Sequence, residues 1–276
     1  MTRAGVPDVS RALADAEPRP YWLGQAGAPP AAEPLTGHET ADLVVIGAGY
    51  SGLWTALLAK ERDPGRDVVL VEAETAGWAA SGRNGGFCSA SLTHGFDNGL
   101  SRFPDEIGTL ERLGRQNLDE IADTVRRYGI DCGFARTGEL EVATADWHLT
   151  GLAATHRAAV ARGLHADLLD RDAVRAEIDS PTYLGGVWDR DGCAMVDPAR
   201  LVWGLRRACL DLGVRLYERT PVARIATAGG DCACPPRTGR STPAGSRWPP
   251  GRTGGCCACC AGTSCRCTTT RWSPGR

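Results

Sequence analysis

The sequence has no apolar run that approaches the roughly 20 residues needed to span a bilayer, and its N-terminus lacks the apolar core of a signal peptide. It also has no large excess of either charge, since the formal net charge is −2 and Lys60 is the only lysine. The 5 histidines show no ligand spacing, so no metal site is predicted from them. These absences predict a cytoplasmic protein with neither a nucleic-acid nor a membrane partner.

The last part of the chain lacks the residues that build a core. From Asp231 to Arg276 there is no Val, Ile, Leu, Met, Phe or Tyr, although 8 of the 12 cysteines lie there. Such a segment cannot bury enough apolar area to offset its chain entropy, so residues 229–276 are predicted to form a disordered tail. The C-x-x-C spacing within Cys256–Cys260 leaves a zinc module as an alternative.

The stretch from Ala41 to Glu72 contains the pattern strand, glycine turn, helix, strand. Apolar runs at 43–46 and 68–71 suit strands that are buried on both faces. Between them a G-x-G-x-x-G motif permits a sharp turn and a close approach of the backbone to a pyrophosphate, while Glu72 can accept hydrogen bonds from ribose hydroxyls. An acid there favours FAD or NAD over NADP, and an ordinary glycine-rich turn is the alternative. The predicted dinucleotide-binding residues are Gly47, Gly49, Tyr50, Ser51, Gly52 and Glu72.

A second glycine-rich segment follows at 73–86. Its many small residues favour neither a helix interior nor a strand, but they suit a loop whose backbone lies against a flat ligand. A flexible surface loop is the alternative interpretation. The residues predicted to line the ligand are Ser81, Gly82, Arg83, Asn84, Gly85 and Gly86.

Periodicity along the rest of the chain predicts alternating helices and strands. Helices are expected over 104–128, 146–162, 170–178 and 197–213. Strands are expected over 183–189, 214–217 and 221–225, together with a hairpin around Thr137-Gly138 within 134–144. The helical stretch between two βαβ-like parts indicates that a second domain interrupts the nucleotide-binding one.

With these residues in view, the chain resembles the FAD-dependent oxidoreductases of the D-amino-acid oxidase and glycine oxidase superfamily. Within it, the likeness is greatest to the bacterial γ-glutamylputrescine oxidase-like members. Three stretches carry the resemblance, at 41–60, at 77–90 with the sequence GWAASGRNGGFCSA, and at 195–225. The Tyr21-Trp22 pair also resembles the N-terminal arm of this group.

The resemblance implies an α/β fold with a Rossmann-like FAD-binding domain. This domain would occupy residues 40–228, with an incomplete α+β substrate domain inserted at about 130–195 and an N-terminal arm at 1–39. The resemblance further implies that Gly47, Gly49, Gly52 and Glu72 bind the ADP half of FAD, that the loop 81–86 lines the diphosphate and the isoalloxazine, and that Val222 touches the adenine.

The activity implied is oxidation of the CH–NH bond of an amine or amino acid to an imine, with molecular oxygen as acceptor and hydrogen peroxide as product. No side chain identifies itself as a catalytic acid or base, and Cys88 is interpreted as a packed thiol. The substrate-domain strands of this family follow the point where the chain loses its apolar residues, so little or no turnover is expected. The alternatives are a non-catalytic dinucleotide-binding fragment and an NAD-dependent reductase.

A reading-frame slip is a third explanation of the tail. Cys and Trp codons begin with TG, so each reads as NTG, encoding Leu, Val or Met, when the frame starts one nucleotide earlier. The 10 Cys and Trp positions after Gly230 would then all be apolar, with strand-like spacing at 232 and 234 and helix-like spacing at 256–260. We hypothesise a slip of one nucleotide close to Gly229-Gly230, which makes this chain a truncated product of its gene.

Overall fold

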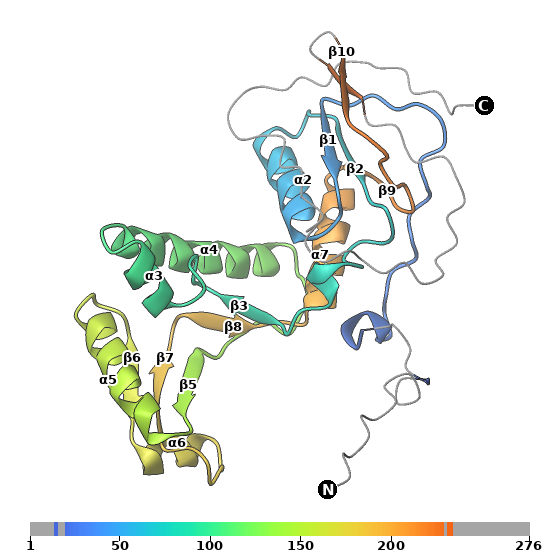
Figure 1. Cartoon of the computed structure of the whole chain (residues 1–276). Coiled ribbons are helices and arrows are strands. Elements are labelled where there is room, and N and C mark those ends of the chain that lie inside the picture. The colour runs from blue at the N-terminus through green and yellow to red at the C-terminus, as the bar shows by residue number, and fades with distance from the viewer. Residues whose placement is uncertain (1–13, 16–19, 229–230, 234–276) are drawn as a thin grey trace, which may run out of the picture.

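The computed structural model describes residues 14–15, 20–228 and 231–233 (Figure 1). A parallel sheet of three strands, in the order β1–β2–β9, forms the body that carries the predicted dinucleotide site. Its strands are β1 (Leu43–Ile46), β2 (Val68–Val71) and β9 (Arg215–Tyr217). All four residues of β2 are buried, which agrees with the uniformly apolar run in the sequence. The predicted α/β, Rossmann-like architecture is confirmed.

Two helices pack together beside this sheet and form the main core with it. Helix α2 (Tyr50–Arg62) directs Leu53, Ala56 and Leu57 inward, and all three are fully buried. Helix α7 (Pro198–Asp211) begins at Asp197, whose carboxylate accepts hydrogen bonds from two backbone amides of the first turn at 3.0 Å. Near the end of α2, Lys60 donates from its Nζ to the carbonyl oxygens of Pro64 and Arg66, which lie just after the helix.

A segment between β2 and α7 forms two antiparallel sheets and four helices. The first sheet pairs β8 (Cys193–Met195) with β3 (Phe87–Ser89) and β4 (Ala135–Arg136). The second pairs β7 (Gly185–Asp189) with β5 (Glu139–Ala143) and β6 (Ala166–Leu169). The helices are α3 (Phe96–Arg102), α4 (Ile107–Arg127), α5 (Asp146–Val160) and α6 (Arg171–Glu177), and Figure 1 shows α5 and α6 beside the second sheet.

The helices predicted from periodicity are confirmed within a few residues at their ends, but two strand predictions are wrong. The hairpin around Thr137-Gly138 does not form, because β4 and β5 pair with different partners in different sheets. The strand over 221–225 is also absent: Pro221 has no backbone N–H to donate, and the region contains only an isolated bridge at Val222.

A short hairpin lies beyond that segment. It pairs β10 (Ala226–Ala228) with β11 (Asp231–Ala233). Strand β11 falls inside the tail that the sequence predicts to be disordered, and it forms because backbone pairing does not require apolar side chains. The other residues of the tail, with their cysteines, lie outside the described residues.

Candidate functional site

The glycine turn between β1 and α2 has the close contacts that its motif predicts. Gly47 adopts a φ of +98°, and its amide donates to the carbonyl oxygen of Val71 at 2.7 Å. A Cβ atom on Gly52 would lie 1.8 Å from the carbonyl oxygen of Gly47, and one on Gly49 would lie 2.9 Å from the Oγ of Ser81. The turn therefore excludes side chains at these two positions, and α2 can pack this closely only because both residues are glycine.

Helix α2 presents its N-terminal amides at this turn. The amide of Tyr50 donates to the hydroxyl of Ser81 at 2.9 Å, which places the second glycine-rich loop across the start of the helix. The amides of Ser51 and Gly52 have no hydrogen-bond partner within the described part of the chain. Unpaired amides at the positive end of a helix dipole are suited to bind a phosphate group.

Glu72 lies at the carboxyl end of β2, beside the glycine turn. Its Oε2 accepts a hydrogen bond from the amide of Ala48 at 2.7 Å, and its Oε1 accepts one from the amide of Glu74 at 2.9 Å. Each carboxylate oxygen can accept a second hydrogen bond. The carboxylate is therefore fixed in place by the backbone and still able to accept from a ribose hydroxyl.

The loop at 81–86 is shaped by its own Asn84. The Nδ2 of this residue donates to the carbonyl oxygens of Ala80 and Ser81, and its Oδ1 accepts from the amide of Gly86 at 2.9 Å. Gly86 has a φ of +83°, and Gly82 is buried against the side chain of Leu23. A Cβ atom on Gly85 would make only an ordinary contact with the ring of Phe87, at 3.4 Å. The hydrogen bond between Tyr50 and Ser81 thus joins this loop to the glycine turn across 31 positions of the chain.

Three of the predicted site residues have contacts of a different kind. The guanidinium of Arg83 lies over the ring of Trp78, 4.5 Å from its centroid, and its Nε donates to the carbonyl oxygen of Trp78. The hydroxyl of Tyr50 donates to the carbonyl oxygen of Pro198, and burial raises the pKa of this phenol above its usual range. Val222 packs against the sheet beside Val69 and Val71.

Sequence reasoning missed Glu218, which is almost completely buried directly after β9. Its carboxylate accepts hydrogen bonds from the amides of Ala32 and Ala76 and from the Nη2 of Arg206, the last at 3.1 Å. It therefore connects the N-terminal segment, the loop after β2 and helix α7. A signal was present in the sequence, because Glu218 follows its buried strand just as Glu72 follows β2.

The segment from Pro20 to Thr40 lies along the site (Figure 1). The indole Nε1 of Trp22, within the short helix η1 (Trp22–Gly24), donates to the carbonyl oxygen of Asn84 at 2.9 Å. Further along, the side chain of Gln25 donates to Asp197, and the amide of Leu35 donates to the hydroxyl of Thr220. The contact from Trp22 therefore ties this segment directly to the 81–86 loop.

Replacing Trp22 with phenylalanine should loosen the 81–86 loop. The substitution keeps an aromatic ring but removes the donor to Asn84, which costs about 1 kcal/mol of local stability and speeds amide exchange roughly fivefold. Hydrogen exchange over residues 80–88 measures this. Trp147→Phe is the matched control, because Trp147 is 76% exposed and far from the loop in sequence. Equal exchange in both variants would contradict the supporting role of Trp22.

The remaining candidate groups carry no evident chemistry. Among the residues that the structure places, no three His, Cys, Asp or Glu side chains gather as a metal site would require. Burial raises the pKa of the Cys88 thiol, which agrees with its interpretation as a packed, unreactive side chain. None of the helices within the described ranges combines the length and the apolar character that a bilayer crossing requires.

Comparison with known proteins gives consistent matches over most of the chain. The family model "FAD dependent oxidoreductase" (DAO) matches residues 42–268. Gamma-glutamylputrescine oxidoreductase of Escherichia coli K12 is 33% identical over 211 residues, which cover 74% of this chain and 48% of that protein. A probable oxidoreductase, OrdL, of Haemophilus influenzae is 29% identical over 204 residues, covering 71% of this chain and 46% of its own length.

A solved structure with the same fold is that of glycine oxidase from Geobacillus kaustophilus. It superposes with a TM-score of 0.60 at 21% sequence identity, over 70% of this chain and 50% of that one. At this identity the likeness shows the fold alone. The chain spans about half the length of the curated relatives it matches.

Proposed function

The chain belongs to the DAO family of FAD-dependent oxidoreductases, and we propose that its glycine turn and the facing loop bind FAD. The observation that carries this proposal is the hydrogen bond from Tyr50 to Ser81, which joins the two glycine-rich segments at the N-terminus of α2. A nucleotide turn alone would suit many ligands. A second loop laid across the same helix end adds a surface for the diphosphate and the flavin beyond it.

The residues present fit this cofactor. The unpaired amides of Ser51 and Gly52 would bind the diphosphate, and the carboxylate of Glu72 would accept from the ribose. Gly47 permits the positive φ of the turn, and Gly49 and Gly52 permit the close packing that holds these amides at the end of the helix. We further propose that the loop 81–86 contacts the flavin and that Val222 contacts the adenine. The NAD-dependent alternative is disfavoured because a nicotinamide cofactor does not require this loop.

We propose oxidation of the CH–NH bond of an amine or amino acid as the reaction of the complete protein. FAD, when bound, supplies the two-electron acceptor, and molecular oxygen would take the electrons on to give hydrogen peroxide. The Escherichia coli relative is named for an amine substrate, γ-glutamylputrescine, which supports this class. The chain itself contributes cofactor positioning, and no acid or base for the reaction is assigned to it.

The 276-residue chain should show little or no turnover, whereas a chain with its reading frame restored near Gly229-Gly230 should be active. The reason is that the restored frame replaces the polar tail with apolar residues that can complete a core. The flavin absorption spectrum and peroxide release with γ-glutamylputrescine, putrescine and glycine would be measured for both chains. Equal turnover by the two chains would refute the frame hypothesis, and a restored chain that folds without retaining FAD would refute the proposed cofactor.

A further inference from the structure

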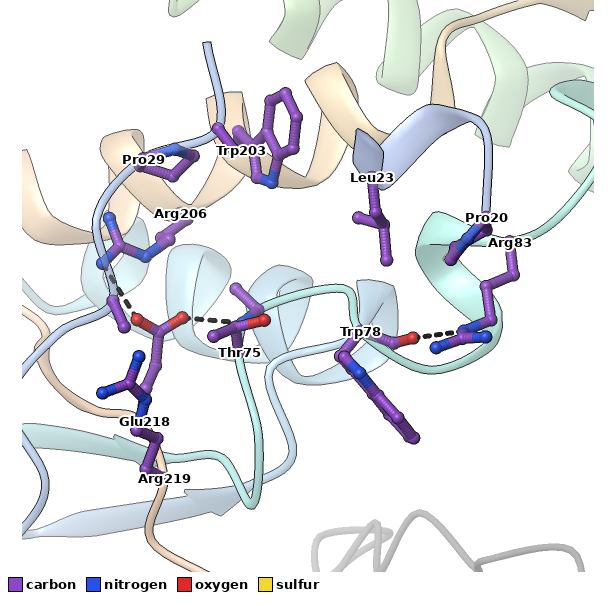
Figure 2. A pocket seen from close by; sticks show the side chains of 13 residues that line it. Pro20, Leu23, Pro29, Thr75, Trp78, Arg83, Trp203, Arg206, Glu218 and Arg219 are labelled. Carbon is purple, nitrogen blue, oxygen red and sulfur yellow. Dashed lines mark hydrogen bonds and ion pairs between the residues drawn. The ribbon is translucent and has the colours of Figure 1, made fainter. Parts of the chain in front are cut away.

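A cavity of about 430 Å³ lies between the N-terminal segment, the loop after β2 and helix α7 (Figure 2). Pro20, Leu23 and Pro29 come from the N-terminal segment, and Trp203 comes from α7. The volume is within the range of about 300–1,000 Å³ typical of pockets that enclose small organic molecules.

This cavity is separate from the glycine turn. The amide of Gly77 donates to the carbonyl oxygen of Ala48 on one side of the loop, and the Cβ direction of Gly77 meets Val202 of α7, at 2.7 Å, on the other. The loop after β2 therefore lies between the glycine turn and α7. Neither Glu72 nor any residue of 47–52 lines the cavity.

The cavity is lined by three arginines and one acid. The acid, Glu218, is already neutralised, because it accepts from Arg206 and from two backbone amides. Arg206 is only 8% exposed, and its Nε is buried without a hydrogen-bond partner. Because this Nε is inaccessible to solvent and the guanidinium is already paired with Glu218, the charge that a ligand meets in the cavity comes mainly from the other two arginines.

The other two arginines add positive charge at the edge of the cavity. Arg219 has no ion-pair partner among the residues that the structure places, and its backbone is held at a φ of +52° by a hydrogen bond from its amide to Glu74. Arg83 stacks on Trp78, which leaves the rest of its guanidinium available. Both arginines line the cavity, and Figure 2 shows Arg219 beside Glu218 and Arg83 beside Trp78.

We infer that this cavity is a binding site for a small organic carboxylate with an apolar, planar body. The arginines supply charge-assisted donors for the carboxylate, and the walls formed by Trp78, Trp203 and Leu23 suit a ring. An inorganic anion would pair with the arginines but would not cover these apolar walls, which would stay in contact with water, so an organic carboxylate fits better. The inference requires no cofactor, and the cavity shares only Arg83 with the loop that is proposed to contact the flavin.

Calorimetric titration of the 276-residue chain with 3-phenylpropionate tests the inference. We expect saturable binding with a Kd on the order of 1 mM or tighter. Acetate carries the charge without the ring and 3-phenylpropionamide carries the ring without the charge, so each should bind at least about tenfold more weakly. Equal affinity for either compound, or no saturable binding to the folded chain, would overturn the site.

Two arginine variants localise the binding. Arg219→Gln removes a charge from the cavity and should weaken binding about tenfold, whereas Arg224→Gln removes an exposed charge outside it and should change the Kd less than about twofold. Far-UV circular dichroism verifies that both variants fold. Equal losses in the two variants would overturn the assignment. Displacement of 3-phenylpropionate by FAD would instead make the cavity part of the cofactor cleft, and it too would overturn a separate site.

Discussion

Gly52→Ala should abolish stable packing of the nucleotide-binding unit. The added methyl group would lie 1.8 Å from the carbonyl oxygen of Gly47 and 3.3 Å from a side-chain methyl of Val45, so α2 must move away from β1. No flexible side chain can yield at the first contact, because the atom it meets belongs to the backbone. We expect a loss of about 3 kcal/mol or more in the free energy of unfolding, measured by urea denaturation.

Gly108→Ala is the matched control for this substitution. Gly108 lies inside helix α4, and a Cβ atom there would meet nothing within 4 Å. Alanine is the better helix former, so this variant should be more stable than the parent by about 0.5–1 kcal/mol. Similar losses in both variants would show that the contact between α2 and the glycine turn does not decide the stability of this unit.

Glu218→Gln should destabilise the chain by about 3–5 kcal/mol. The substitution keeps the shape of the side chain but leaves the buried guanidinium of Arg206 without its counter-charge. It also turns an acceptor of three hydrogen bonds into a group whose NH₂ faces other donors. Urea unfolding measures the loss, and hydrogen exchange at Ala32 and Ala76 reports whether their amides lose their acceptor.

Two further variants test whether the buried pair of Arg206 and Glu218 contributes more stability than an ion pair on the surface. Asp123→Asn removes the partner of Arg126 on the surface, where both side chains are more than half exposed, and should cost less than about 1 kcal/mol. The double variant Arg206→Met, Glu218→Gln removes the unpaired charge and should regain part of the stability lost in Glu218→Gln. A loss in Glu218→Gln no larger than that in Asp123→Asn would contradict the role of the buried pair.

The sequence was most informative where the structure depends on neighbours in the chain. The β1–α2–β2 unit was predictable because its apolar runs and its glycines act within a few residues of one another. The helices over 107–127 and 198–211 were predictable for the same reason. The error at 134–144 arose because alternation in a short segment does not specify which strand it pairs with. The error at 221–225 arose because Pro221 has no backbone N–H to donate to a neighbouring strand.

Individual site residues could be recognised from the sequence, but their arrangement could not. The motif at 47–52 and the loop at 81–86 are each visible as glycine-rich segments, and the motif has a physical reason for each of its three glycines. The hydrogen bond between Tyr50 and Ser81 spans 31 positions, and no local pattern requires it. It exists because the loop after β2 turns back over the start of α2.

By itself, the sequence determined the nucleotide turn, the helices other than α3, the apolar strands β1 and β2 and the loss of core-forming residues after Asp231, since these depend on local composition and period. Only the tertiary structure decided that Glu218 would join Ala32, Ala76 and Arg206, and that Trp22 would support Asn84 from 62 positions away. The physical reason is that a buried carboxylate or an indole N–H requires a partner, but many residues could supply one, and only the folded backbone selects which of them comes within hydrogen-bonding distance.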